Sequence, residues 1–156
     1  MIIQVKLSDI IEGMDSQSDE RSCYLSKKTG EIIAILDEEL RAAEEDDPIE
    51  TFPEWQRPSI KIAQEILEST GHYVALPSQF EIHEYSIMER FCLSPDDEQI
   101  SDALYSSIKG RGAFRRFRDA IHRLNIAGDW YAYREEAFKQ IARDWCKENG
   151  IEFIDR

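Results

Sequence analysis

A short basic motif in the C-terminal half of the sequence carries the residue types best suited to chemistry. It runs from Lys109 to Arg118, and its two glycines, Gly110 and Gly112, flank Arg111. At about 100° per residue of helix, Arg111, Arg115 and Arg118 share a face with His122. A helix N-terminus flanked by guanidinium groups favours an anion such as a phosphate or a carboxylate. We therefore predict an anion-binding site formed by Gly110, Arg111, Gly112, Arg115, Arg118 and His122.

The same motif also allows a purely structural interpretation. Gly110 could end one helix, Gly112 could form a tight turn, and the arginines could pair with acidic side chains of the same chain. The formal charge is −10 over residues 1–56, −6 over 57–108, +5 over 109–123 and −2 over 124–156. The basic motif is thus an island in an acidic chain, facing either its own acids or an external anion.

The overall composition limits the class of protein. The chain has 156 residues, 32 acidic and 19 basic side chains, and a net charge of −13. Non-specific binding of duplex DNA is excluded, because neutralising phosphates needs an excess of lysine and arginine. An apolar content of 42% excludes disorder of the whole chain. No secretory signal or membrane-length apolar run is present, so we expect a cytoplasmic protein without a membrane partner.

A second pair of residues interrupts apolar helix faces. Arg134 lies within an apolar stripe that includes Trp130, and Glu84 intrudes on the apolar arc of its own helix. A buried charge must be paired, since an unpaired one costs several kcal/mol. We therefore predict a buried ion pair between Arg134 and Glu84. Glu89 is the alternative acid, an arginine of the basic island is the alternative base, and fixing helix register is the alternative role.

Signals for catalysis or cofactor binding are weak. The pair His83-Glu84 lacks the second histidine of a zinc helix, and Cys23, Cys92 and Cys146 never stand in a C-x-x-C spacing. We predict reduced, mostly buried thiols, no metal site and no cofactor. His122 is the best acid–base candidate, although a surface histidine beside arginines is usually solvated.

Aromatic residues follow the basic motif closely. Trp130, Tyr131 and Tyr133 could stack on the bases of single-stranded RNA or DNA beside the arginines. In the alternative interpretation, Trp130 and Tyr133 fill the core and Tyr131 lies at its edge.

The pattern of elements predicts an α+β fold. The strongest signal is a β-hairpin over residues 22–35, whose Gly30 suits the positive φ of the turn. We expect a single domain in which residues 1–56, a hairpin portion with short helices, pack on a mainly helical portion over residues 57–156. Further expectations are a strand over 1–7, a helix capped by Ser8, helices over 37–45, 59–69, 81–93, 95–109 and 113–125, an extended segment over 72–80, and a last helix capped by Asp129 that runs to Asn149 before Gly150.

The chain resembles a family of small, acidic bacterial proteins known as uncharacterised protein family 0158. The resemblance rests on the segment Tyr24–Glu31, the acidic segment Pro48–Trp55, the motif Gly110–Phe117 (GRGAFRRF), the pair Trp130-Tyr131, and Trp145. It covers nearly the whole chain. It implies a bacterial cytoplasmic protein and assigns no catalytic residue.

The sequence therefore favours a non-enzymatic interaction or regulatory protein that binds an anionic group through residues 109–118. The partner would be RNA, a small ligand or an acidic protein segment. One alternative is an enzyme acting on a phosphorylated or nucleotide substrate, with Arg111, Arg115 and Arg118 stabilising charge and His122 carrying a proton. Another is an acidic protein that mimics nucleic acid.

Overall fold

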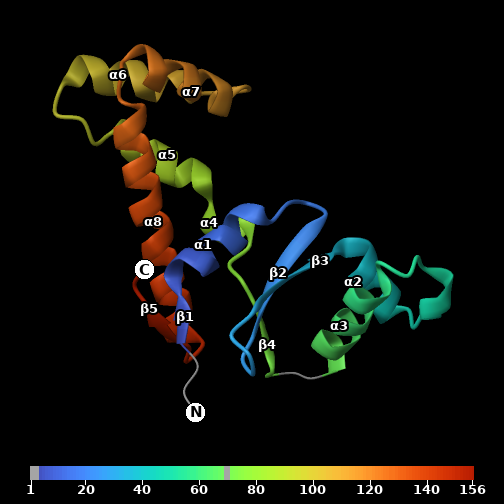
Figure 1. Cartoon of the computed structure of the whole chain (residues 1–156). Helices are drawn as coiled ribbons and strands as arrows, with labels where there is room; N and C mark the ends of the chain where they lie inside the picture. The colour runs from blue at the N-terminus through green and yellow to red at the C-terminus, as the bar shows by residue number, and fades with distance from the viewer. Residues whose placement is uncertain (1–3, 69–70) are drawn as a thin grey trace. The chain divides into compact units, whose positions relative to one another are not determined.

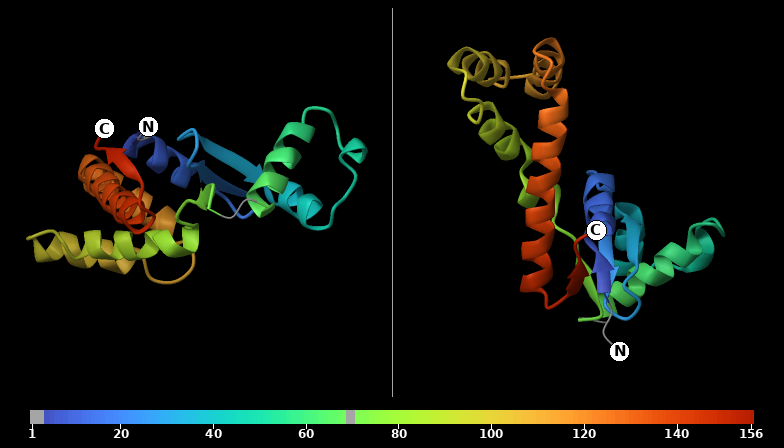
Figure 2. Two further views of the ribbon diagram at one scale, coloured as in Figure 1. Left: turned by 90° about the horizontal axis from the view of Figure 1, so that it is seen from below. Right: turned by 60° about the vertical axis from the view of Figure 1, so that its left-hand side comes forward.

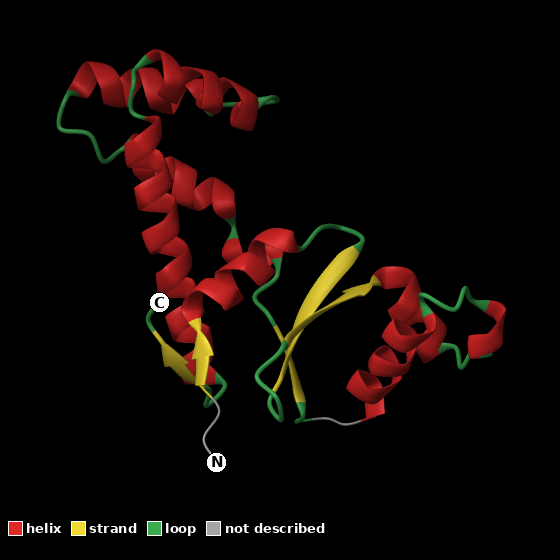
Figure 3. Ribbon diagram, viewed as in Figure 1, coloured by secondary structure: helices red, strands yellow, loops and turns green. Residues whose placement is uncertain are grey.

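The computed structural model describes residues 4–68 and 71–156, and it has the predicted α+β fold, with strands mainly in the N-terminal half and helices in the C-terminal half (Figures 1 and 3). The chain divides into two compact units. Unit 1 comprises Met1–Glu81 and Ile141–Arg156, and unit 2 comprises Ile82–Gln140. The expectation of a single domain stays a prediction.

Unit 1 combines two small sheets with several helices. Its elements are β1 (Gln4–Lys6), α1 (Leu7–Ser16), β2 (Arg21–Ser26), β3 (Ile32–Leu36), α2 (Asp37–Glu44), the 3-10 helix η1 (Ile49–Thr51), α3 (Arg57–Glu68), β4 (Tyr73–Ala75), most of α4 (Gln79–Ile82), the C-terminal end of α8 (Ala127–Glu148) and β5 (Glu152–Ile154).

The predicted hairpin is confirmed as the antiparallel pair β2–β3. Cys23 lies opposite Ala34, and Gly30 adopts the positive φ of 78° that the turn requires. The strand β4 joins the other edge of β2, so the sheet order is β3-β2-β4. Beyond the hairpin, α2 and α3 lie side by side in both views of Figure 2, around a small core of Ile35, Ala43 and Ala63. The predicted end of α3 at residue 69 lies outside the described residues.

The start of α1 differs from the prediction. The helix begins at Leu7 after Lys6, so Ser8 lies inside the first turn and is not the N-cap. The side chain of Leu7 is fully buried, and its burial favours a helix that begins directly after β1 ends. The backbone N–H of Ser8 donates to the carbonyl of Arg156 at 2.8 Å, and this bond replaces a side-chain cap.

The last strand is not predicted by any pattern in the sequence. Residues beyond Gly150 form β5, which pairs in parallel with β1 through Val5 and Phe153. The predicted role of Gly150 in ending the last helix is confirmed. It has a φ of 65°, and Ile151 N–H donates to the Cys146 carbonyl at 2.8 Å, as in a Schellman motif.

Unit 2 is helical. Its elements are α5 (Glu84–Cys92), α6 (Glu98–Ser107), α7 (Ala113–Arg123) and the N-terminal part of α8. The single helix predicted over residues 81–93 is wrong, because His83 has a left-handed φ of 51° and separates α4 from α5. Hydrogen-bonding contacts with Ser86 hold this break: the Ser86 N–H donates to the His83 carbonyl at 2.9 Å, and Ser86 Oγ lies 2.8 Å from His83 Nδ1.

The helix α8 begins two residues before the predicted cap. Asp129 therefore lies in its first turn and does not form the N-cap. The cause is the tight end of α7, where Asn125 has a φ of 59° and Ile126 N–H donates to the Ile121 carbonyl at 2.9 Å. Trp130 N–H then donates to the Ile126 carbonyl at 3.1 Å, so the helical bonds start early.

Four aromatic rings from three helices form the centre of unit 2. Phe91 of α5 lies 6.0 Å from Phe117 of α7 and 5.3 Å from both Trp130 and Tyr133 of α8, between ring centroids. Phe117 and Trp130 are 4.9 Å apart with their planes at 81°. Such edge-to-face pairs contribute about 0.5–1.5 kcal/mol each beyond the burial of apolar area.

Across the part of the chain that is described, no helix combines the length and apolar character needed to cross a bilayer.

Candidate functional site

The basic motif forms the loop between α6 and α7 and the first turns of α7. Gly110 and Gly112 have positive φ values of 79° and 74°, and Gly112 is the N-cap residue of α7. A side chain other than hydrogen is strained in this region of φ and ψ. The two glycines therefore allow the tight connection that brings α7 beside α6 (Figure 1).

Arg116 holds this loop in place. Its guanidinium group donates to the Ser107 carbonyl at 3.0 Å and to the carbonyls of Lys109 and Arg111. These carbonyls belong to the last residue of α6 and to the loop that follows it. A cation is favoured there, because the carbonyls at the C-terminal end of a helix carry partial negative charge. Sequence spacing alone does not predict this role. A usable signal is that Arg116 stands one turn into α7, where helical side chains point back toward the N-terminus.

The other predicted anion-binding residues remain accessible. Arg111, Arg115, Arg118 and His122 are all exposed. Within residues 4–68 and 71–156, the guanidinium groups of the three arginines form no ion pair with the acids of the chain. Arg116 and the two glycines therefore have a structural role in the loop. Arg111, Arg115 and Arg118 can contact an external anion.

A pocket of about 370 Å³ lies beside the motif, entirely within unit 2. Its apolar lining includes Met88, Phe117 and Ile121, whose side chains are almost fully buried. Phe114 and Tyr131 also line it, and they are 52% and 56% exposed. Of the predicted anion-binding residues, only Arg118 lines this pocket. The remaining lining residues are Glu84, Trp130 and Arg134.

Glu84 and Arg134 meet in the wall of the same pocket. Arg134 Nε donates to Glu84 Oε1 at 2.5 Å. The two side chains are 37% and 25% exposed, so the pair is half-buried and not buried as predicted. The guanidinium carbon of Arg134 also lies 4.1 Å from the centroid of the Phe138 ring, a cation–π contact. Arg134 is thus held from two sides, and it fixes the direction of the Glu84 carboxylate.

The pocket combines three chemical features. It offers aromatic surface at Phe114 and Tyr131, a guanidinium group at Arg118, and an oriented carboxylate at Glu84. The Glu84–Arg134 pair is neutral as a whole, so Arg118 leaves the pocket with a net positive charge. This set suits a ligand with a flat, neutral, polar body and an attached anionic group.

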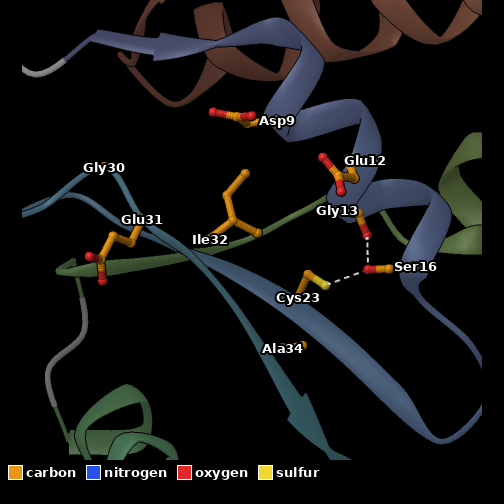
Figure 4. Close-up of a pocket in the computed structure, with 9 residues that line it drawn as sticks. All are labelled: Asp9, Glu12, Gly13, Ser16, Cys23, Gly30, Glu31, Ile32 and Ala34. Carbon is orange, nitrogen blue, oxygen red and sulfur yellow. Dashed lines mark hydrogen bonds between the residues drawn. The ribbon is translucent and has the colours of Figure 1, made fainter.

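Unit 1 contains a second pocket of opposite character (Figure 4). It has a volume of about 520 Å³, and three carboxylates line it, from Asp9 and Glu12 of α1 and from Glu31 beside the hairpin turn. No basic side chain belongs to its lining. No three His, Cys, Asp or Glu side chains among the described residues are arranged to hold a metal ion.

The three cysteines are free and buried, as predicted. Burial raises the pKa of the Cys146 thiol to about 11. Burial, with a smaller effect of the Glu89 charge, also raises the pKa of Cys92 to about 11. Ser16 Oγ donates to the Gly13 carbonyl at 2.9 Å and lies 3.3 Å from Cys23 Sγ, as Figure 4 shows. Protonated, buried thiols are poor nucleophiles.

Fold and pocket together describe an α+β protein whose helical unit presents an aromatic pocket beside a basic loop. The chain belongs to the uncharacterised protein family UPF0158, whose family model matches residues 1–156. No curated protein and no solved structure matches the chain. The function must therefore be argued from the pocket itself.

Proposed function

We propose that the protein is a non-enzymatic interaction protein that binds single-stranded RNA at the pocket of unit 2. One observation carries the proposal: Arg118 of the basic motif lines the same pocket as the exposed rings of Phe114 and Tyr131. A cationic group next to exposed aromatic rings is the combination that single-stranded nucleic acids use, through phosphate contact and base stacking.

The exposed rings favour this interpretation over a purely structural one. Large apolar side chains are normally buried, and more than half of the surface of Phe114 and Tyr131 is exposed beside a pocket. Stacking of a base on such a ring contributes roughly 1–3 kcal/mol. The neighbouring Arg111 and Arg115 are exposed and supply further phosphate contacts outside the pocket.

The charge distribution is compatible with RNA binding at this unit. Unit 2 holds 10 acidic and 9 basic residues, whereas unit 1 holds 22 acidic and 10 basic ones. The excess of negative charge therefore belongs to unit 1. Binding at unit 2 should nevertheless be moderate and sensitive to salt, because few phosphates are contacted.

The test is fluorescence anisotropy with a labelled, single-stranded RNA of mixed sequence. Tyr131→Ala should weaken binding by roughly fivefold to a hundredfold if one base stacks on the ring. Arg118→Gln should weaken it severalfold through the loss of a phosphate contact. Arg123→Gln is the matched control, because Arg123 is an exposed arginine of α7 that does not line the pocket.

Equal affinities for the wild type and the Arg118→Gln and Tyr131→Ala variants would contradict the proposal. Binding of an acidic peptide at this pocket, with no binding of RNA, would likewise contradict it and favour a protein partner. Circular dichroism of each variant verifies that the helices remain folded.

A further inference from the structure

We infer that the pocket of unit 2 selects a guanine base, which the Glu84 carboxylate recognises. This inference rests on the proposed function, since it names the base that the RNA-binding pocket accepts. It follows from the oriented Glu84–Arg134 pair, which RNA binding in general does not require.

Guanine is the base whose hydrogen-bonding edge matches a carboxylate. An ionised carboxylate only accepts hydrogen bonds, through two oxygens. The Watson–Crick edge of guanine places two donors, N1–H and the N2 amino group, side by side. Adenine and cytosine each place a ring acceptor beside their amino group, and uracil places one donor between two carbonyls. Those three bases would bring an acceptor against the carboxylate, which leaves it unsatisfied.

The geometry of the pair supports this role for Glu84. Arg134 Nε donates to Glu84 Oε1 at 2.5 Å, and the Glu84 side chain, which is 37% exposed, lines the pocket. A carboxyl group has about four lone-pair sites, so one bond to Arg134 leaves acceptor capacity. Arg134 is in turn held over the Phe138 ring. Because the Glu84 side chain is already held in one orientation, it loses little conformational entropy when a base binds. Its fixed orientation also favours one arrangement of hydrogen-bond donors on the base.

The two charged groups of the pocket favour different parts of a nucleotide. The Glu84 carboxylate repels an anion placed next to it, whereas Arg118 attracts one. A nucleotide satisfies both, since its base is neutral and its phosphate is separate. An acidic peptide side chain would instead bring a carboxylate into the pocket with Glu84. The volume of about 370 Å³ is at the small end of ligand pockets, which suits one nucleotide.

The experiment uses the full chain and short uridine oligonucleotides that carry one central guanosine, adenosine, cytidine or inosine. The wild type should bind the guanosine oligonucleotide roughly tenfold or more tightly than the adenosine and cytidine ones. Inosine lacks the N2 amino group and should lose most of this preference. The inosine comparison needs no variant, so it remains informative even if a substitution disturbs folding.

Glu84→Gln gives the sharpest second test. An amide presents one donor and one acceptor, which match the paired amino group and ring nitrogen of adenine or cytosine, so the preference should move from guanosine toward adenosine and cytidine. A merely structural role for Glu84 would weaken binding of all oligonucleotides alike. Glu89→Gln is the matched control, because Glu89 lies on the same helix and does not line the pocket, and it should keep the guanosine preference.

The outcomes for the two proposals are distinguishable. Equal affinity for all four oligonucleotides, with loss of binding in Arg118→Gln, would overturn the guanine inference and leave RNA binding in place. Binding of free guanosine monophosphate, but not of adenosine monophosphate or of any oligonucleotide, would support guanine recognition and contradict RNA as its source. No binding of any oligonucleotide or nucleotide would overturn both.

Discussion

Two pockets of the molecule, one in each unit, have opposite electrostatic character. The pocket of unit 1 is lined by the carboxylates of Asp9, Glu12 and Glu31 and by no basic residue. The pocket of unit 2 is lined by two guanidinium groups, of which Glu84 neutralises one. A net charge of −13 for the chain therefore says little about either pocket. Local charge decides which partner a pocket suits, and of these two pockets that of unit 2 suits a phosphate.

The two units also differ in how they are packed. In unit 1, α1 approaches the sheet so closely that Gly13 has no room for a side chain: a Cβ there would lie 2.6 Å from Leu76 Cδ2. In unit 2, a cluster of aromatic rings fills the core, and two of its members, Phe117 and Trp130, also line the pocket. Substitutions in the two units should therefore have different consequences.

The largest expected effect is on the stability of unit 2. Phe117→Ala removes a ring that is 3% exposed and packs on both Phe91 and Trp130. It should lower the free energy of unfolding by about 3–5 kcal/mol, measured by urea denaturation followed through tryptophan fluorescence. Phe114→Ala on the same helix is the control and should change it by less than about 0.5 kcal/mol. Similar losses for both variants would show that Phe114 belongs to the core.

A pair of glycine substitutions compares the two units directly. Gly13→Ala should destabilise the protein by up to about 2 kcal/mol, because overpacking of the new methyl group against Leu76 and Ile32 costs about 1–3 kcal/mol. The higher helix propensity of alanine within α1 offsets about 1 kcal/mol of this cost. Gly128→Ala in the first turn of α8 has nothing within 4 Å of its Cβ and should stabilise by roughly 0.5 kcal/mol. Thermal or urea denaturation of both variants measures this difference, and effects of the same sign would refute the packing contrast.

Alkaline pH should destabilise both units through their buried thiols. The pKa of Cys92 in unit 2 and that of Cys146 in unit 1 are raised from 9.0 to about 11. Between these values the unfolded chain loses protons that the folded chain keeps, so stability falls as pH rises. The slope approaches about 1.4 kcal/mol per pH unit for each thiol. The stability of Cys92→Ala, measured across this range, should fall less steeply than that of the wild type, and parallel curves would show that burial leaves the Cys92 pKa unchanged.

The smallest expected effect is on the salt dependence of RNA binding. For single strands, the slope of log Kobs against log salt is about −0.7 for each phosphate that is neutralised. Arg118→Gln should make this slope less negative by about 0.7, whereas Glu12→Gln in the acidic pocket should leave it unchanged. Anisotropy titrations at several salt concentrations measure both slopes. A change with Glu12→Gln of the same size would place the RNA at unit 1.

Local signals predicted much of the fold. Two β-prone runs around Gly30 predict the β2–β3 hairpin, and Gly150 predicts the end of the last helix. The strand β5 could not be predicted, since it has three residues and pairs with β1 at the opposite end of the sequence. The break at His83 depends on a left-handed backbone that its residue type does not require.

The sequence predicts several residues of the candidate site, but not which of them line one pocket. The intrusion of Arg134 and Glu84 on apolar helix faces indicated that they pair. The arginines of α7 could not be told apart by spacing alone. The structure separates Arg116, which donates to three carbonyls, from Arg118, which lines the pocket. That distinction depends on the loop between α6 and α7, because its carbonyls accept hydrogen bonds from the guanidinium group of Arg116 and not from that of Arg118.

The most direct test is a titration of isotope-labelled protein with single-stranded RNA, followed by NMR. The proposal predicts chemical-shift changes centred on Phe114, Arg118 and Tyr131, and on the indole N–H of Trp130. Amides around Glu12 and Glu31 in the acidic pocket should remain unchanged. Changes centred on unit 1, or none at either pocket with RNA in excess, would contradict the assignment of the RNA-binding site to unit 2.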